Sequence, residues 1–184
     1  QAQAVRAWDC GRYGRCQEYL PLVHGFFEGC IRKARLRLQG KGSLSDLRKA
    51  LENSKMLSSD VSAGFDPLFP GVNEAKNSAY LGNGICFNKF TGSRGKSGCN
   101  DAMPEFFAEI RKVMDDADVN FQTAELGRVD QGGGGTIAYI LGNYNMNVID
   151  AGIAVLNMHA PMEIVSKVDV YEAYLGYKAF ISKL

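Results

Sequence analysis

Apolar residues along this chain recur with two different spacings, which predicts helices alternating with strands. Spacings of three and four residues are typical of one helix face, and short alternating or continuous apolar runs are typical of strands. The predicted helices cover residues 19–38, 43–53, 103–116, 136–141 and 166–184. The predicted strands cover residues 56–65, 84–90, 119–124 and 148–151. This alternation predicts an α/β fold in which helices are layered against a sheet.

Local signals mark the starts of two of these helices. Ser43 is expected to cap the helix over 43–53, because a hydroxyl can accept a hydrogen bond from the first free backbone N–H groups. Asp101 is predicted to be the N-cap of the helix over 103–116 for the same reason. The positions of that helix that should face the core are Phe106, Phe107, Ile110 and Val113.

Composition and cysteine usage limit the class of protein. With 184 residues, of which 46% are hydrophobic and 22% charged, the chain resembles one globular domain. No run approaches the roughly 20 apolar residues of a membrane span, and residues 1–8 lack the apolar run of a secretory signal. The five cysteines are scattered without a CxxC pair, which favours a reduced protein. We therefore expect a cytoplasmic protein with no membrane partner.

The net charge of +1 conceals an asymmetry along the chain. Residues 1–55 contain 11 Lys and Arg against 5 Asp and Glu, whereas residues 56–184 contain 10 against 15. A basic end is typical of arms that bind nucleic acid, but this one lacks interleaved aromatic residues and any named nucleic-acid motif. We interpret it as a solvated helix face and expect no nucleic-acid partner.

Two glycine-rich segments are candidates for ligand loops. Residues 92–97 end in Gly-Lys-Ser, but the phosphate-loop motif needs glycine where Phe90 stands, and it needs the helix to begin at Lys-Ser. We therefore do not expect a nucleotide-binding loop there. Gly132 to Gly135 precede a predicted helix, so their backbone amides could approach a ligand at its N-terminus. A flexible turn is the equal alternative.

Three ionisable side chains are candidates for chemistry. His24 lies in an apolar helical pattern and is interpreted as a packing residue. His159 follows a strand, where α/β folds expose loops to ligands, and is either a ligand or acid–base residue or an ordinary loop residue. Asp60 lies in a run otherwise apolar or small, so its carboxylate should meet a metal, a cation or hydrogen-bond donors.

Four segments occur in an order that resembles a known family. Together they resemble the M18 family of zinc aminopeptidases, the group of aspartyl aminopeptidase and vacuolar aminopeptidase I, over about Leu44 to Leu184. The resemblance implies the C-terminal part of a peptide-hydrolysing catalytic domain. The implied fold is a three-layer αβα zinc-exopeptidase-like domain with a mixed sheet, incomplete at its N-terminal side. The four segments are Asn53–Val61, Thr91–Gly98, Gly127–Thr136 and Val155–Pro161.

The resemblance also implies roles for particular residues. In the family, two zinc ions share a bridging carboxylate and a water, and the corresponding ligands here are Asp60 for one ion and His159 for the other. Oxygen and imidazole ligands suit zinc. The implied substrate contacts are Lys89, Lys96, Gly134 and Gly135.

Other family residues are not matched in this sequence. The Glu-Glu pair that supplies the general base and a further ligand should fall near Arg12-Tyr13, where neither residue is a carboxylate. Residues 1–19 therefore look irregular and unlike the family, and residues 20–184 form the expected catalytic segment. We expect a truncated chain with little activity, no catalytic base of its own and doubtful zinc occupancy. A non-catalytic remnant of the same fold is the alternative, and homo-oligomerisation is a family trait that stays open here.

Overall fold

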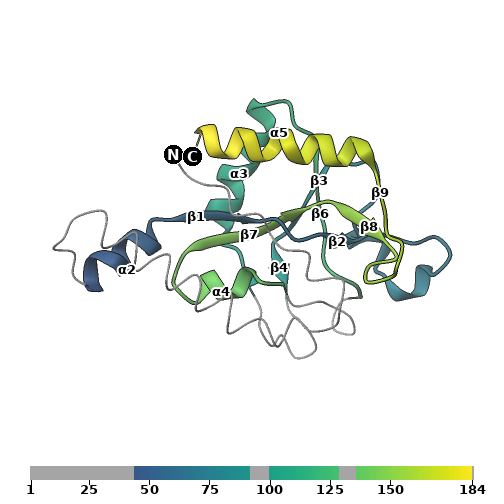
Figure 1. The fold of residues 1–184 in the computed structure, drawn as a ribbon, viewed down its shortest axis with the longest axis horizontal. Coiled ribbons are helices and arrows are strands. Elements are labelled where there is room, and N and C mark those ends of the chain that lie inside the picture. The colour runs from purple at the N-terminus through teal and green to yellow at the C-terminus, as the bar shows by residue number, and fades with distance from the viewer. Residues whose placement is uncertain (1–43, 92–99, 129–135, 184) are drawn as a thin grey trace.

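The described part of the chain folds as a mixed sheet between helices. The structure is a computed structural model and describes residues 44–91, 100–128 and 136–183. Four strands form the main sheet in the order β1-β7-β3-β6, in which β3 runs antiparallel to β7 and the other two pairs are parallel. Helices α3 and α5 cover one face and α4 the other (Figure 1). The expected three-layer α/β architecture with a mixed sheet is confirmed.

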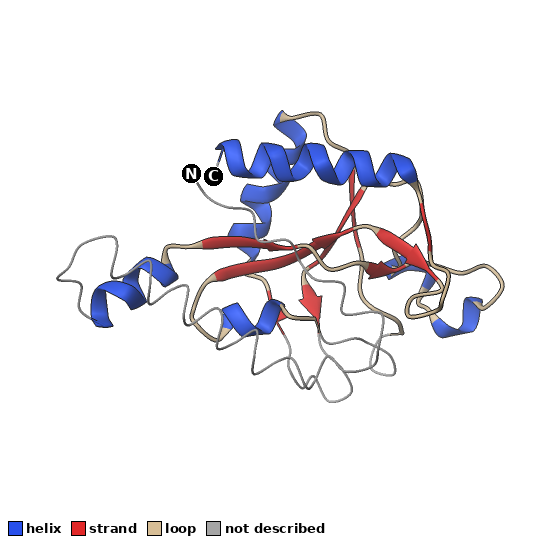
Figure 2. Cartoon of the chain, in the orientation of Figure 1, coloured by secondary structure: helices blue, strands red, loops and turns tan. Residues whose placement is uncertain are grey.

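The element bounds agree with most of the predicted segments. Figure 2 shows the helices and strands in the orientation of Figure 1. The main-sheet strands are β1 (Lys55–Ser58), β7 (Asn147–Gly152), β3 (Ile85–Asn88) and β6 (Phe121–Thr123). The longer helices are α2 (Leu44–Glu52), α3 (Pro104–Asp116), α4 (Ala138–Gly142) and α5 (Lys167–Lys183), and two short 3-10 turns cover Pro70–Val72 and Ala75–Asn77. Residues 19–38 and Ser43, predicted as a helix and a cap, lie outside the described residues.

Short strands form two smaller sheets that the sequence did not predict in full. The strands β2 (Ser62–Ala63), β8 (Ala154–Leu156) and β9 (Ile164–Val165) form one, and β4 (Phe90–Thr91) and β5 (Asn100–Asp101) the other. Because these strands have only two or three residues, they show no periodicity to recognise.

The core lies between the main sheet and helices α3 and α5. The Phe87 ring of β3 meets the rings of Phe107 and Phe121 at centroid distances of 6.0 and 5.8 Å, both edge-on. Phe106, Ile110 and Val113 are buried as predicted, and Phe107 packs partly buried against the same cluster. The amphipathic pattern of α3 therefore identified its core face correctly.

The predicted cap of α3 is wrong. Asp101 lies in β5, where its backbone pairs with Phe90 and its carboxylate forms an ion pair with Lys89. The helix begins instead at Pro104, and the N-cap position, Met103, makes no side-chain hydrogen bond to it. Proline at the first helical position fixes a helical φ and has no N–H to leave unpaired, so the helix can start without a polar cap.

Helix α5 is fixed to the sheet by a buried carboxylate in its first turn. Asp169 is fully buried, and its two oxygens accept hydrogen bonds from the N–H groups of Gly82 at 2.8 Å and Gly84 at 2.9 Å. Both glycines have positive φ, and a Cβ on Gly84 would lie 2.0 Å from the Asn120 carbonyl oxygen. Glycine is therefore required at position 84 for the chain to enter β3.

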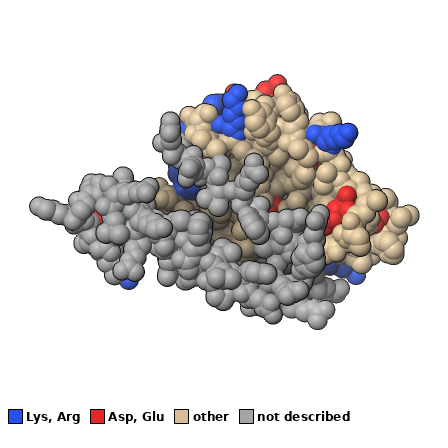
Figure 3. Space-filling model, viewed as in Figure 1, with Lys and Arg blue, Asp and Glu red and all other residues tan. Residues whose placement is uncertain are grey.

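Among the described residues, none of the helices combines the length and apolar character needed to cross a bilayer. On the face shown in Figure 3, Lys and Arg side chains are interspersed with Asp and Glu over the described surface.

We expect the Asp169→Ala substitution to lower the free energy of unfolding by about 1–3 kcal/mol, because it leaves the buried N–H of Gly84 without a partner. Urea unfolding followed by circular dichroism measures this loss. The exposed Asp115→Ala variant is the matched control and should stay within about 0.5 kcal/mol of the parent chain. Equal effects of the two substitutions would contradict the anchoring role of Asp169.

Candidate functional site

The predicted ligand Asp60 lies in a break between two strands. Strand β1 follows β7 in parallel as far as the pair Ser58 and Asp150. Pairing then stops and resumes where the Ser62 N–H donates to the Ile153 carbonyl at 2.9 Å. Residues 59–61 therefore leave the ladder, although no residue is inserted, because the pairs Ser58–Asp150 and Ser62–Ala154 keep the same register. We call residues 59–61 the Asp60 bulge.

The bulge approaches β7 so closely that only glycine fits opposite it. A Cβ built on Gly152 would lie 1.8 Å from the Asp60 carbonyl oxygen and 3.0 Å from the Val61 Cα. Real side chains do not tolerate such a distance, so any other residue at this position would push the bulge away. Gly152 thus places the Asp60 backbone directly against the end of β7.

The charge of His159 reaches the carboxyl group of Asp60. Burial, the largest influence, raises the pKa of Asp60, whereas the Val61 backbone N–H and the charge of His159 lower it. Charge effects in salt solution fade beyond about 10 Å. The structure therefore brings the two predicted ligands into electrostatic range, although they are far apart in sequence.

His159 projects from the turn that follows β8. Its φ of 69° and the φ of 58° at Asn157 are uncommon for residues other than glycine. The His159 backbone N–H donates to Glu163 Oε1 at 2.6 Å, and this contact holds the turn. The side chain is exposed. An imidazole presented to solvent from a strained turn is suited to binding a ligand.

A second acidic side chain, Asp150, lies in this region and escaped the sequence reasoning. It is fully buried, and its Oδ2 accepts a hydrogen bond from Thr136 Oγ1 at 2.7 Å. Among the described residues its Oδ1 and the hydroxyl of Ser58 lack a hydrogen-bond partner. The signal that could have found Asp150 was the one that identified Asp60, a carboxylate within an apolar run.

The surroundings of Asp150 favour its neutral form. Burial is the main cause that raises the pKa of Asp150 to about 6, and the charge of Asp60 raises it further. The hydroxyls of Thr136, Ser58 and Thr91 oppose this rise. The Ser58 hydroxyl is near enough to Asp150 to favour the ionised form of that carboxyl group, but the two groups do not have the geometry of a hydrogen bond.

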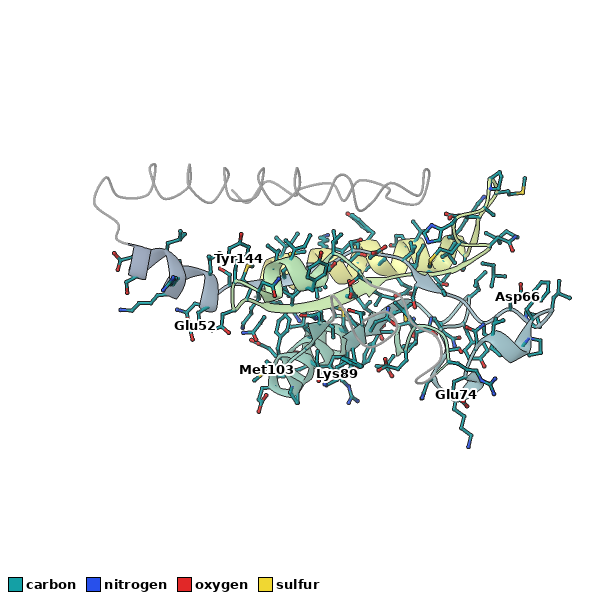
Figure 4. All side chains as sticks on the ribbon, turned by 90° about the horizontal axis from the view of Figure 1, so that it is seen from below. Glu52, Asp66, Glu74, Lys89, Met103 and Tyr144 are labelled. Atoms are coloured by element: carbon teal, nitrogen blue, oxygen red, sulfur yellow. The ribbon has the colours of Figure 1, made fainter. Side chains whose placement is uncertain are left out.

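The predicted substrate contacts are described only in part. Lys89 forms an ion pair with Asp101, and its carbonyl accepts from the Ala102 N–H at 2.8 Å, so it lies beside Met103 at the start of α3 (Figure 4). Lys96, Gly134 and Gly135 lie outside the described residues. Thr136, the residue after Gly135, is buried and bonded to Asp150, so the end of the glycine segment is tied to β7.

The donors at this site match zinc in type but not in number. A carboxylate oxygen from Asp60 and an imidazole nitrogen from His159 are both common zinc ligands. Within residues 44–91, 100–128 and 136–183, no group of three or more His, Cys, Asp or Glu side chains is arranged to hold a metal ion. A stable site would therefore need further donors besides these two.

Comparison with protein families gives a match along most of the chain. The family model described as aminopeptidase I zinc metalloprotease (M18) matches residues 25–181. The probable M18 family aminopeptidase 1 of Clostridium acetobutylicum is 63% identical over 157 residues, which are 85% of this chain and 34% of that protein. The chain thus spans about a third of the length of the curated relatives it matches.

Solved structures show the same fold. The crystal structure of aminopeptidase I from C. acetobutylicum has a TM-score of 0.75 at 62% identity and matches 84% of this chain and 33% of its own. An M18 aminopeptidase from Thermotoga maritima has a TM-score of 0.75 at 39% identity, with 95% and 38% covered. The mApe1 dodecamer of S. cerevisiae, at 20% identity, TM-score 0.68 and coverage of 95% and 36%, supports the fold alone.

Asp150→Asn should change how stability depends on pH. Because the folded pKa of about 6 lies above the ordinary value of 3.8 for an aspartate, Asp150 makes the folded state less stable as pH rises from about 4 to 7, by about 2–3 kcal/mol. The asparagine variant should therefore gain this much relative to the parent chain across that range. Urea unfolding in EDTA-containing buffers measures the difference, and Asp115→Asn is the exposed control. A difference independent of pH would contradict the burial effect.

Proposed function

Because the chain belongs to the M18 family of zinc metalloproteases, we propose that it forms the C-terminal part of the catalytic domain of a zinc-dependent aminopeptidase. The proposed reaction is the hydrolytic removal of N-terminal amino acids from peptides. The single observation that supports the site is that the charge of His159, in its turn, lowers the pKa of Asp60, in its bulge.

In this proposal Asp60 holds one of two zinc ions and His159 holds the other. Zinc, when bound, supplies the Lewis acidity that activates water and polarises the scissile carbonyl. The half-buried position of Asp60 suits a ligand, because the carboxylate is partly desolvated already and gains from a nearby cation.

The remaining residues of the chain would bind and orient the peptide. Lys89 and Lys96 are proposed to meet a substrate carboxylate or the oxyanion that develops during hydrolysis. For Lys89 this requires release from Asp101, a surface ion pair that costs little to exchange. Gly134 and Gly135 are proposed to approach the substrate with their backbone, and the Thr136–Asp150 hydrogen bond would fix the end of that segment.

We propose that these 184 residues alone have little or no peptidase activity. Asp60 and His159 give one protein ligand to each ion, whereas catalytic zinc sites have about three. The sequence also lacks the glutamate pair of the family near Arg12-Tyr13. A missing general base alone removes roughly 10²–10⁴-fold of rate. Homo-oligomer formation and a cytoplasmic location stay predictions.

The alternative is a non-catalytic remnant of the same fold. The observation that favours it is that α5 is held to the sheet by hydrogen bonds from Gly82 and Gly84 to Asp169, which involve neither proposed metal ligand. Metal content separates the two proposals, since a remnant would bind no zinc at the Asp60 bulge.

We expect zinc binding to depend on both proposed ligands. Competition with a chromophoric chelator should give an apparent Kd for Zn²⁺ that rises at least tenfold in Asp60→Asn and in His159→Ala, because each substitution removes the sole described ligand of one ion. The matched control is His24→Ala, which removes the other histidine and should leave the Kd unchanged. Equal binding by all four proteins would favour the remnant.

Activity is measured in parallel with a fluorogenic aminoacyl substrate and added Zn²⁺ or Mn²⁺. The expected turnover of the chain is at most a thousandth of that of a complete relative, since the general base is missing. Robust turnover that His159→Ala abolishes would disprove the proposed dependence on further donors.

A further inference from the structure

A tyrosine of the C-terminal helix is hydrogen-bonded both to the Asp60 bulge and to the adjacent strand β7. The hydroxyl of Tyr177 in α5 lies 2.6 Å from the Ala151 carbonyl oxygen on β7 and 2.7 Å from the Ser59 hydroxyl in the bulge. Ser59 precedes Asp60, and Ala151 follows Asp150. One phenol group thus joins the segments that carry both acidic side chains.

The Ala151 carbonyl is available because the ladder is broken at this point. Alternate residues of a strand direct their backbone groups to the same neighbour. Asn147 N–H donates to the Ser54 carbonyl at 3.1 Å, and the Ile153 carbonyl accepts from Ser62. Ala151 is an even number of residues from both, so its backbone groups face the same side. Its carbonyl meets the bulge instead of a strand, and the Tyr177 hydroxyl takes the place of the missing backbone donor.

The direction of both hydrogen bonds follows from the number of protons. A phenol has one proton, and a carbonyl can only accept, so Tyr177 donates to the Ala151 oxygen. The Ser59 hydroxyl must then donate to the Tyr177 oxygen. Burial raises the pKa of Tyr177, and the Ser59 hydrogen bond lowers it. The two hydrogen bonds therefore run in one direction, from the Ser59 hydroxyl to Tyr177 and from Tyr177 to the Ala151 carbonyl.

Solvent can reach the bulge on the other side of this contact. A shallow groove of about 310 Å³ runs between α5 and the break in the sheet, and its lining includes Ser59, Val61, Tyr174 and Tyr177. Without the phenol hydroxyl, Ser59 would have water as its partner, and the bulge would be held to β7 only by the close contact at Gly152.

We propose that Tyr177 is a positioning residue that fixes the Asp60 bulge and thereby the direction of the Asp60 carboxylate. The consequence of this inference is that α5 sets the geometry of one zinc ligand without touching metal or substrate. That consequence rests on the proposed function. Groups that orient a metal ligand in this way change metal affinity by 10–100-fold when they are removed.

The first test is hydrogen exchange in the metal-free chain. Tyr177→Phe should accelerate exchange of the amides of residues 59–61 at least fivefold, because local opening no longer breaks the two hydrogen bonds. Exchange in α3 should stay unchanged, which separates a local effect from general destabilisation. Tyr171→Phe is the matched control, since Tyr171 lies on the exposed side of the same helix. Unchanged exchange at residues 59–61 in Tyr177→Phe would overturn the proposal.

The second test is the Zn²⁺ competition assay on the same proteins. The expected result is an apparent Kd about tenfold higher in Tyr177→Phe and unaltered in Tyr171→Phe. If Asp60→Asn weakens binding but Tyr177→Phe does not, the positioning role is wrong while the proposed function stands. If neither Asp60→Asn nor His159→Ala affects zinc, the proposed function fails, and the exchange experiment still decides whether Tyr177 fixes the bulge.

Discussion

The break in the ladder between β1 and β7 is the constraint on which the rest of the site depends. A strand that continued to pair past Ser58 would bond its backbone to β7 and direct Asp60 by strand alternation alone. Instead backbone pairing stops for residues 59–61 and resumes at Ser62. Such a step exposes backbone groups that a sheet interior would leave unpaired. Gly152 and Tyr177 resolve this, one by giving space and the other by giving a donor.

Helix α5 connects this break to the opposite side of the fold. Its first turn is held by Asp169 against the glycines that lead into β3, and its fourth turn places Tyr177 over the bulge. Gly176, beside Tyr177, is buried against Met114 of α3, with a Cβ position 3.2 Å from the sulfur. The helix is thus fixed at both ends of its buried face, so the tyrosine hydroxyl has a defined position relative to the sheet.

The sequence predicted what depends on periodicity and missed what depends on contacts between distant segments. The 3.6-residue pattern of α3 identified Phe106, Ile110 and Val113 as core residues, because one face of a long helix repeats the signal several times. Asp101 failed as a cap because its partners are Phe90 of the neighbouring strand β4 and Lys89, the residue before that strand. Tyr177 carried no signal at all, since α5 itself carries apolar residues on its exposed and its buried faces and the hydroxyl partner of Tyr177 lies more than a hundred positions away.

The two acidic side chains of the site are unfavourable to each other unless a cation is near. Asp60 and Asp150 each have a raised pKa, and the charge of Asp60 contributes to the rise at Asp150. Only Asp60 is accessible enough to bind a ligand, because Asp150 is fully buried and bonded to Thr136. A cation at Asp60 would relieve the repulsion between the two carboxylates, because a bound metal ion lowers the pKa of acidic groups near it. Above about pH 6, where Asp150 is ionised, its charge would add to the attraction of Asp60 for a cation, although its burial keeps it from being a ligand.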